Sequence, residues 1–221
     1  WKYLNKISKS NCSTGSDCEI ILDLYFKYGI KQTLQMLDGV FAFIIFDKTK
    51  NKIIAARDTY GVRPLFICSQ ENPKSVAKYI SNIYFASELK SLYDICLYKE
   101  NEDTKDGILQ KKFKKQQFPP GHYLEFSLND EFIVSFDFIR FSECNGFQVK
   151  TIRDVNTAIR DSLIEAVAKR VDNTDREIAC LLSGGLDSSL ITGLVVNVCK
   201  MRYNRHPSTI HTWSIGMEGS M

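Results

Sequence analysis

The sequence has little of what would direct it to a membrane or to nucleic acid. None of its apolar runs approaches the roughly 18 residues of a membrane span, and no secretory signal is visible. The formal charge of the 221 residues is only +3, which is too small to argue for a nucleic-acid partner. The hydrophobic fraction is that of an ordinary globular protein. We therefore expect a cytoplasmic globular protein of one large or two small domains, with no membrane and no nucleic acid as partner.

The cysteines lack the spacing of a metal site. None of the seven forms a Cys-x-x-Cys pair with another. Several lie in apolar segments, namely Cys68, Cys96, Cys180 and Cys199. We expect free, buried thiols in a reducing compartment.

A Walker A lysine is also absent. The stretch Cys180-Leu-Leu-Ser-Gly-Gly-Leu-Asp-Ser-Ser189 contains a glycine-rich turn, but no Gly-Lys-Ser/Thr follows it. Residues 178–182 are too short and too apolar for anything but a buried strand of a parallel sheet. An apolar helix begins near Asp187. A glycine-rich turn between strand and helix presents free backbone N–H groups and the positive end of the helix dipole, an arrangement that holds phosphate.

The residue types in this turn suit a phosphate ligand. Gly184 and Gly185 let the backbone approach closely, and the hydroxyls of Ser183 and Ser188 can add donors. Asp187 is the exception, because a carboxylate repels phosphates unless a cation lies between them. Magnesium is the expected cation, since it takes carboxylate and phosphate oxygens together. The alternative is an ordinary strand-to-helix turn, which the order of strand, turn and helix disfavours.

The first part of the chain reads as antiparallel hairpins with a few helices. Ser16 and Glu19 predict a capping box for a helix that ends near Gly29. That helix is expected to bury four residues, Ile20, Ile21, Leu24 and Tyr25. Residues 40–46 are apolar on both faces, which predicts a covered central strand. Residues 52–57 follow as the returning strand of a hairpin.

Three later features complete this part. Arg57 and Asp58 follow a strand, and we interpret them as structural residues that brace a bend at Gly61.

Residues 99–117 are charged, but their lysines alternate with acidic residues and no aromatic platform accompanies them. A solvated surface loop is therefore favoured there over a nucleic-acid patch. Further strands are expected at residues 65–68, 83–87, 123–127 and 132–138.

Between residues 141 and 150 the hairpin-rich pattern of the sequence gives way to a helical pattern. This change predicts two domains, 1–145 and 146–221. In the second, residues 151–171 predict an amphipathic helix, and residues 210–215 predict the strand after the glycine turn. Strand, helix and strand at this spacing form a βαβ unit, whose ligands bind at the carboxyl ends of the strands. The chain starts with Trp1 rather than Met, and we interpret it as an internal piece of a longer protein.

Several of these motifs resemble known families. Asp38-Gly-Val-Phe-Ala-Phe43 and Arg57-Asp-Thr-Tyr-Gly-Val-Arg-Pro-Leu-Phe66 are similar to the glutaminase domain of class II (N-terminal-nucleophile) glutamine amidotransferases. The Ser-Gly-Gly-Leu-Asp-Ser turn resembles the pyrophosphate loop of the ATP pyrophosphatase superfamily. The combination resembles the glutamine-hydrolysing asparagine synthetase family. Three further motifs read as that family does, in the family's order: Ser16-Asp-Cys-Glu-Ile-Ile21, Pro119-Pro-Gly-His-Tyr123 and Trp213-Ser-Ile-Gly-Met-Glu218.

The resemblance implies a fold and a reaction. The fold is an α+β N-terminal-nucleophile hydrolase-type sandwich, the glutaminase domain, followed by the start of an α/β ATP pyrophosphatase domain with a parallel sheet. The reaction is ATP-dependent adenylation of aspartate and then amidation by ammonia released from glutamine. Its products are asparagine, glutamate, AMP and diphosphate. The implied cofactors are ATP and Mg²⁺, and a homodimer is compatible with the resemblance.

The resemblance also implies residue roles. Asp17 corresponds to the aspartate that binds the α-amino group of glutamine, and Leu181 and Ile215 correspond to positions that hold the adenosine of ATP. Pyrophosphate would be bound by Ser183, Gly184, Gly185, Asp187 and Ser188, with Asp187 near magnesium. The family's nucleophile is an N-terminal cysteine whose own amino group is the base. It would lie upstream of Trp1, so we expect no catalytic residue in this chain and no activity from the chain by itself.

Two alternatives remain at this point. One is a related class II amidotransferase that adenylates another carboxylate, such as a β-lactam synthetase. The other is a non-catalytic homologue retained for binding or regulation. The intact turn at residues 183–189 and the presence of Asp17 weigh against the second alternative.

Overall fold

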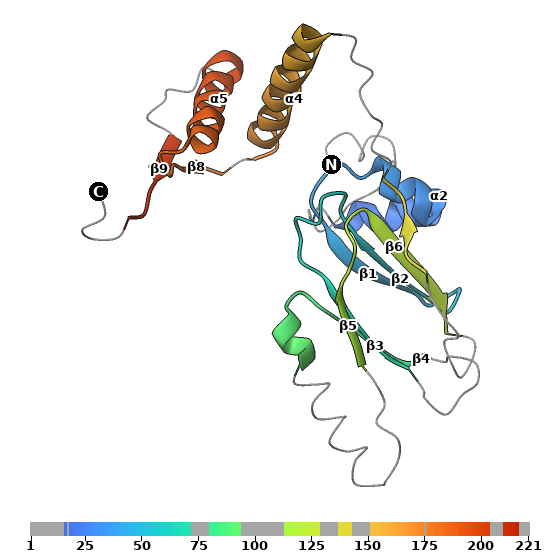
Figure 1. Ribbon diagram of the computed structural model, residues 1–221. Helices are drawn as coiled ribbons and strands as arrows, with labels where there is room; N and C mark the ends of the chain where they lie inside the picture. The colour runs from blue at the N-terminus through green and yellow to red at the C-terminus, as the bar shows by residue number, and fades with distance from the viewer. Residues whose placement is uncertain are drawn as a thin grey trace. The chain divides into compact units, whose positions relative to one another are not determined.

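The computed structural model describes residues 16, 18–71, 80–93, 113–128, 137–142, 151–174, 176–203 and 210–216. They form a mixed α/β structure that divides into two compact units, Trp1–Cys144 and Asn145–Met221 (Figure 1). No helix within the described ranges has both the length and the apolarity to cross a membrane. The predicted strand at residues 132–138 lies largely outside the described residues, as does most of the predicted domain boundary.

The first unit begins with helix α2, Glu19–Met36. The predicted capping box is wrong, because the N-cap residue is Cys18, and the hydroxyl of Ser16 instead accepts a hydrogen bond from the Cys18 N–H at 3.3 Å. The helix is interrupted at Gly29, whose φ of 75° is not helical. The first helical segment therefore ends at Gly29, as predicted, and a second segment continues to Met36. The four residues predicted to be buried are all buried, namely Ile20, Ile21, Leu24 and Tyr25.

Two antiparallel sheets make up the rest of this unit. The four-stranded sheet contains β1 (Ala42–Asp47), β2 (Lys52–Arg57), β6 (His122–Ser127) and β7 (Ile139–Arg140), in the order β1-β2-β6-β7. The three-stranded sheet contains β3 (Phe66–Glu71), β4 (Ile80–Ala86) and β5 (Phe113–Gln117), in the order β4-β3-β5. The β1–β2 hairpin is the one predicted from the sequence.

The core of the first unit lies on both faces of strand β2. Alternate residues of a strand point to opposite faces. Ile54 and Ala56 accordingly pack in a cluster with helix α2, whereas Ala55 packs with Ile67 of β3 and with Phe118. The four-stranded sheet is therefore covered by α2 on one face and by the three-stranded sheet on the other (Figure 1).

Two predictions for the first unit are wrong. Strand β1 is not central but lies at the edge of the described four-stranded sheet, and Ile44 and Phe46 are 47% and 55% exposed. The apolar pattern does not reveal which strands pair with the edges of β1, and the described residues leave the face that carries Ile44 and Phe46 partly exposed. The predicted solvated loop at residues 99–117 lies mostly outside the described residues, and its described part, Phe113–Gln117, is strand β5, which pairs with β3. Its lysines are compatible with this because β5 is an edge strand in the described sheet, where charged side chains are common.

The second unit contains α4 (Ile152–Asp172), β8 (Ile178–Leu181), α5 (Leu186–Tyr203) and β9 (Ile210–Trp213). Strands β8 and β9 pair in parallel, from Ile178 with Ile210 to Leu181 with Trp213. This confirms the predicted βαβ unit. Helices α4 and α5 pack through a small apolar core: Val167, Ala168, Val171, Val195, Val198 and Cys199. Helix α4 begins at the N-cap Thr151, whose hydroxyl accepts a hydrogen bond from the Asp154 N–H at 3.2 Å.

Candidate functional site

The candidate site is the loop of residues 183–188, which joins the carboxyl end of β8 to the first turn of α5. The ladder of β8 and β9 continues one residue past β8, since the Leu182 N–H donates to the Trp213 carbonyl at 2.8 Å. The chain then turns at Gly184, whose φ of 83° favours glycine. Apart from Gly184 itself and its two chain neighbours, no residue has a heavy atom within 4 Å of the place where a Gly184 Cβ would stand. Its requirement for glycine is therefore conformational.

The Ser188 hydroxyl lies at the centre of this loop. Its Oγ accepts a hydrogen bond from the Ser183 N–H at 3.3 Å and lies 3.0 Å from the Ser183 Oγ. It is also within 3.1 Å of the Gly185 carbonyl oxygen. These contacts give the free loop a defined shape. They also hold both serine hydroxyls close to the N-terminus of α5, where a phosphate group would be bound.

Asp187 lies in the first turn of α5 and is exposed. Within the described ranges, no group of three or more His, Cys, Asp or Glu side chains could enclose a metal ion. A magnesium ion at this loop would therefore combine the Asp187 carboxylate with phosphate oxygens and water. Magnesium commonly binds in this way, through one or two carboxylates together with substrate phosphates. The donors present fit that arrangement.

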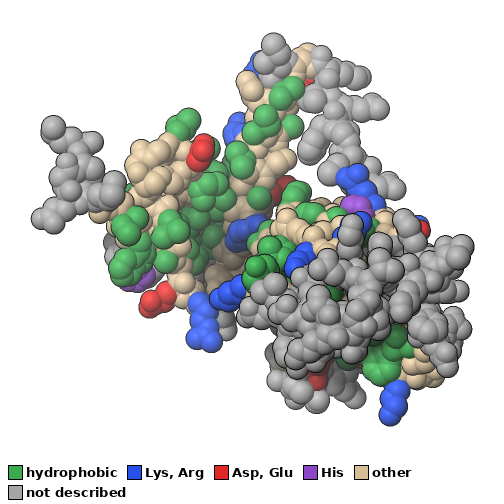
Figure 2. All heavy atoms as spheres, turned by 60° about the horizontal axis from the view of Figure 1, so that its bottom comes forward, with side chains coloured by type: hydrophobic (Ala, Val, Ile, Leu, Met, Phe, Trp, Pro, Cys, Tyr) green, Lys and Arg blue, Asp and Glu red, His purple; other side chains and the backbone are tan. Residues whose placement is uncertain are grey.

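A cavity begins at this loop. Its volume is about 570 Å³, within the roughly 300–1,000 Å³ of small-molecule pockets. Asp187 and Ser188 line it together with Leu181, and its remaining wall is largely apolar, with Val167 and Val171 from α4 and Ile191 and Val195 from α5. The second unit also presents apolar side chains on its surface, which appear as green patches in Figure 2.

The predicted adenosine residues differ in their positions. Leu181 is the last residue of β8, lines the cavity and is 81% exposed. Ile215 lies two residues beyond β9, so it follows the same edge of the parallel sheet, and it is 100% exposed. It is not one of the residues that line the cavity. The structure therefore brings Leu181, Asp187 and Ser188 to one cavity and leaves Ile215 at the adjoining strand end.

In the first unit, the predicted glutamine ligand Asp17 lies outside the described residues. The predicted structural role of Arg57 and Asp58 at the bend near Gly61 is confirmed. Arg57 is 3% exposed and donates to the carbonyls of Gly61, Arg63 and Phe118 at 2.6, 2.7 and 2.7 Å. Asp58 is 1% exposed, and its carboxylate accepts the N–H groups of Val62 and Arg63, each at 3.0 Å.

The same brace joins two motifs that are far apart in the sequence. The Gly121 N–H donates to the Asp58 carbonyl at 2.8 Å. A Cβ on Gly61 would stand only 2.8 Å from Pro120 Cγ and 2.9 Å from Arg57 Cζ, so glycine is required there for close packing. The Arg57-to-Phe66 and Pro119-to-Tyr123 motifs thus form one structural element. The sequence contains no signal for this pairing, because the hydrogen bond that joins the two motifs runs between backbone groups of Gly121 and Asp58.

Family comparisons match both parts of the chain. The family model described as glutamine amidotransferase domain matches residues 3–133. That is more than half of the 221 residues. The chain belongs to the glutamine amidotransferase domain family. A second family model, described as asparagine synthase, matches residues 158–221. The glutamine amidotransferase match thus lies in the first unit, and the asparagine synthase match includes the 183–188 loop of the second.

Curated relatives are similar along nearly the whole chain. The glutamine-hydrolyzing asparagine synthetase of Cricetulus griseus is 36% identical over 237 residues, which cover 99% of this chain and 38% of the relative. That of Homo sapiens is 36% identical over 225 residues, covering 94% and 36%. That of Gallus gallus is 34% identical over 222 residues, covering 92% and 35%. The resemblance predicted from the motifs is therefore confirmed, and the chain spans a little over a third of these relatives' length.

Proposed function

We propose that this chain is part of an ATP-dependent ligase that makes asparagine from aspartate, with glutamine as the nitrogen donor. One observation carries the proposal. The Ser-Gly-Gly-Leu-Asp-Ser loop stands between a parallel strand and a helix and borders a cavity, and it follows a glutamine amidotransferase domain in the same chain. The name shared by the relatives supports the pairing of these two activities.

The proposed reaction needs ATP because a carboxylate is a poor electrophile. A side-chain carboxylate oxygen of aspartate bonds to the α-phosphorus of ATP, and the bond from that phosphorus to the β-phosphate oxygen breaks to release diphosphate. Ammonia from glutamine then attacks the acyl carbon, and AMP leaves with its bonding electron pair. The first step places negative charge on the departing diphosphate, which is where preorganised donors lower the barrier most.

The 183–188 loop supplies those donors in this proposal. Backbone N–H groups at the start of α5 and the hydroxyls of Ser183 and Ser188 bind diphosphate oxygens. Asp187 would hold Mg²⁺, which neutralises phosphate charge when it is bound. Leu181 and Ile215 would contact the adenosine, and Asp17 would bind the α-amino group of glutamine. The apolar cavity wall supports a site for the base, because small-molecule pockets are lined mainly by apolar side chains.

Several finer assignments belong to the same proposal. The first unit would be a glutaminase domain of the N-terminal-nucleophile type, and its antiparallel sheets and covering helix are compatible with that fold. The second unit would be the start of an α/β ATP pyrophosphatase domain, which the parallel β8–β9 pair supports. A cytoplasmic location and a homodimer are expected of the enzyme as well.

The deciding experiment measures diphosphate release by the full-length protein with ATP and magnesium. Aspartate is present or absent, and the nitrogen donor is glutamine or ammonia. Aspartate-dependent release with both donors, together with asparagine as product, is the expected result. Release with ammonia alone would mean that the glutaminase half is inactive. Release that does not depend on aspartate would overturn the proposed substrate and direct attention to other carboxylates.

A further inference from the structure

The Gly185 carbonyl oxygen accepts three hydrogen bonds at the start of α5. It accepts the backbone N–H of Ser189 at 3.1 Å, the Ser189 hydroxyl at 2.8 Å and the Ser188 hydroxyl at 3.1 Å. Ser189 thus provides two of the three donors, and it stands just outside the residues to which the proposed function gives a role.

The Ser188 hydroxyl cannot serve all its neighbours at once. A serine hydroxyl has one proton to donate, and two acceptors lie within reach of it, the Gly185 carbonyl at 3.1 Å and the Ser183 hydroxyl at 3.0 Å. When Ser188 donates its proton to a diphosphate oxygen, it stops donating to Gly185. The Ser189 hydroxyl then remains as the side-chain donor to that carbonyl.

The direction of the Gly185 carbonyl matters for anion binding. A trans peptide is planar, and its C=O and N–H point in opposite directions. Holding the Gly185 oxygen toward the first turn of α5 therefore turns the next N–H, that of Leu186, out of the helix N-terminus. That N–H is one of the helix's unpaired donors, the groups that bind phosphate.

We propose that Ser189 is a positioning residue of the 183–188 loop. Its hydroxyl holds the Gly185 carbonyl, which frees the Ser188 proton for diphosphate and fixes the direction of the Leu186 N–H. This inference rests on the proposed function and deepens it. It concerns the diphosphate part of the site and not the adenosine part, and the test uses that difference.

The test compares inhibition constants of two products, inorganic diphosphate and AMP, for the full-length protein with ammonia as nitrogen donor. Ser189→Ala should raise the inhibition constant of diphosphate about three- to tenfold, as expected for the loss of one ordinary hydrogen bond, here the one to the Gly185 carbonyl. The inhibition constant of AMP should not change. Ser189→Thr keeps the hydroxyl, and Ser189 is exposed, so that its extra methyl group has room. This variant should behave like the wild type.

Two further variants separate positioning from stability. Thr151→Ala removes the N-cap of α4 and should lower the melting temperature while leaving both inhibition constants unchanged. In Ser188→Ala the Ser188 proton is already absent, so adding Ser189→Ala should cost less than it does in the wild type. An unchanged diphosphate constant in Ser189→Ala, an equal rise for AMP, or no recovery in Ser189→Thr would overturn the inference while the proposed function stands. Wild-type protein without ATP-dependent diphosphate release would overturn both.

Discussion

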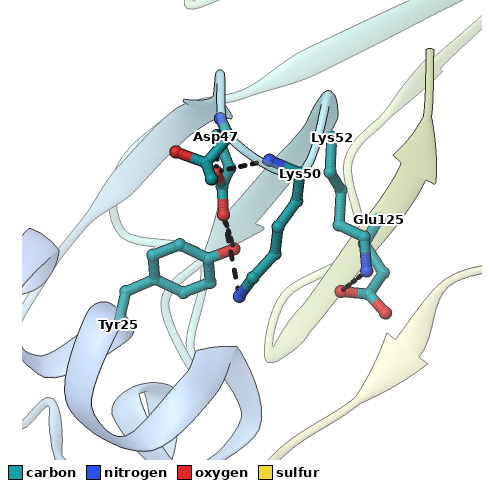
Figure 3. Close-up of polar contacts among 6 residues, drawn as sticks. Tyr25, Asp47, Lys50, Lys52 and Glu125 are labelled. Carbon is teal, nitrogen blue, oxygen red and sulfur yellow. Dashed lines mark hydrogen bonds and ion pairs between the residues drawn. The ribbon is translucent and has the colours of Figure 1, made fainter. Parts of the chain in front are cut away.

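The Tyr25 hydroxyl donates a hydrogen bond of 2.7 Å to the Asp47 carboxylate, which joins helix α2 to the end of strand β1 (Figure 3). Both residues are 4% exposed. The same carboxylate accepts the N–H groups of Thr49 and Lys50, each at 3.0 Å, and so shapes the β1–β2 turn. The Lys50 ammonium lies 3.7 Å from Asp47 and 5.2 Å from the centre of the Tyr25 ring. One carboxylate therefore both forms the hairpin turn and attaches the hairpin to the helix.

Removing the Tyr25 hydroxyl should destabilise the first unit. Tyr25→Phe keeps the ring in the core but leaves Asp47 without its side-chain donor. We expect a loss of about 1.5–3 kcal/mol in the free energy of unfolding, as is typical of a hydrogen bond to a charged group. Urea denaturation at pH 7 measures it. Tyr60→Phe is the matched control, because Tyr60 is 83% exposed and its change should stay within about 0.5 kcal/mol. Equal losses in the two variants would contradict the assignment.

The Asp47 carboxylate should also make stability depend on acid pH. The hydrogen bond from Tyr25, followed by that from the Lys50 N–H, holds the pKa of Asp47 below its ordinary value of 3.8. A carboxylate with a lowered folded-state pKa stabilises the fold above its unfolded-state pKa, and this contribution is lost as the pH falls through the folded-state pKa. Unfolding midpoints measured from pH 6 down to pH 2 should therefore fall less steeply in Asp47→Asn than in the wild type. Parallel curves would contradict this.

The Tyr25 hydroxyl should make stability depend on alkaline pH, in the direction opposite to that of Asp47. Burial, together with the hydrogen bond to Asp47, raises the pKa of Tyr25 to about 12 from its ordinary 10.0. The stability that comes from this raised pKa is complete below pH 10 and is lost as the pH rises toward 12. Absorbance of phenolate at alkaline pH should accordingly show a late-titrating component that Tyr25→Phe reduces, whereas the contribution of Tyr123, whose pKa burial also raises, should remain. A titration curve unchanged by that substitution would show that Tyr25 is not the late group.

Even the conservative substitution Arg57→Lys should destabilise the first unit. Its guanidinium reaches three carbonyls at once, whereas an ammonium is a point donor on a flexible stem. We expect Arg57→Lys to lower the free energy of unfolding by about 2–3 kcal/mol, because buried carbonyls lose charged donors. Arg63→Lys is the matched control, since the side chain of Arg63 is exposed. Thermal denaturation compares the two variants. Similar melting temperatures for Arg57→Lys and Arg63→Lys would contradict the structural role of the Arg57 guanidinium.

Elements with a strong periodic pattern could be predicted from the sequence. We expect strands at residues 52–57 and 178–182, and strands lie at Lys52–Arg57 and Ile178–Leu181. The expected burial of 178–182 is wrong for the described residues, since Ala179 and Leu181 are exposed. The helix expected at 151–171 lies at Ile152–Asp172. In each case the local pattern of apolar residues and the caps agree with the packing, so the sequence alone contains the information.

Features set by distant partners could not be predicted. Strand β5 consists largely of lysine and glutamine, and it is a strand because its backbone pairs with β3. The hydrogen bond of Tyr25 with Asp47 spans 22 positions, and no local pattern marks it. For the candidate site, the motif identified the 183–188 loop, but the α4 wall of its cavity depends on how α4 packs on α5. The tandem Ser188 and Ser189 were visible in the sequence, but only the structure shows that both hydroxyls reach the Gly185 carbonyl and that Ser188 also contacts Ser183.

Two glycines of the second unit should respond in opposite ways to alanine. Gly184 has a φ of 83°, where a Cβ costs roughly 1–2 kcal/mol. Gly193 lies inside α5 with no heavy atom within 4 Å of an added Cβ, and helix interiors favour alanine by about 0.5–1 kcal/mol. Gly184→Ala should therefore lower the melting temperature and raise the KM for ATP, whereas Gly193→Ala should raise the melting temperature and leave KM unchanged. Changes in the same direction would contradict the conformational role of Gly184.

Asp187 should set the magnesium requirement of the proposed reaction. Asp187→Asn keeps the size of the side chain but removes the negative charge that would hold the cation between the loop and the phosphates. We expect the magnesium concentration for half-maximal diphosphate release to rise roughly tenfold, about 1.4 kcal/mol of lost metal affinity. Asp161→Asn serves as the control, because this carboxylate lies on α4 and pairs with the exposed Arg160. If saturating magnesium restores the wild-type rate to Asp187→Asn, the carboxylate acts through the cation. If the magnesium dependence is unchanged while the rate falls, Asp187 acts on the loop's structure and the cation is held elsewhere.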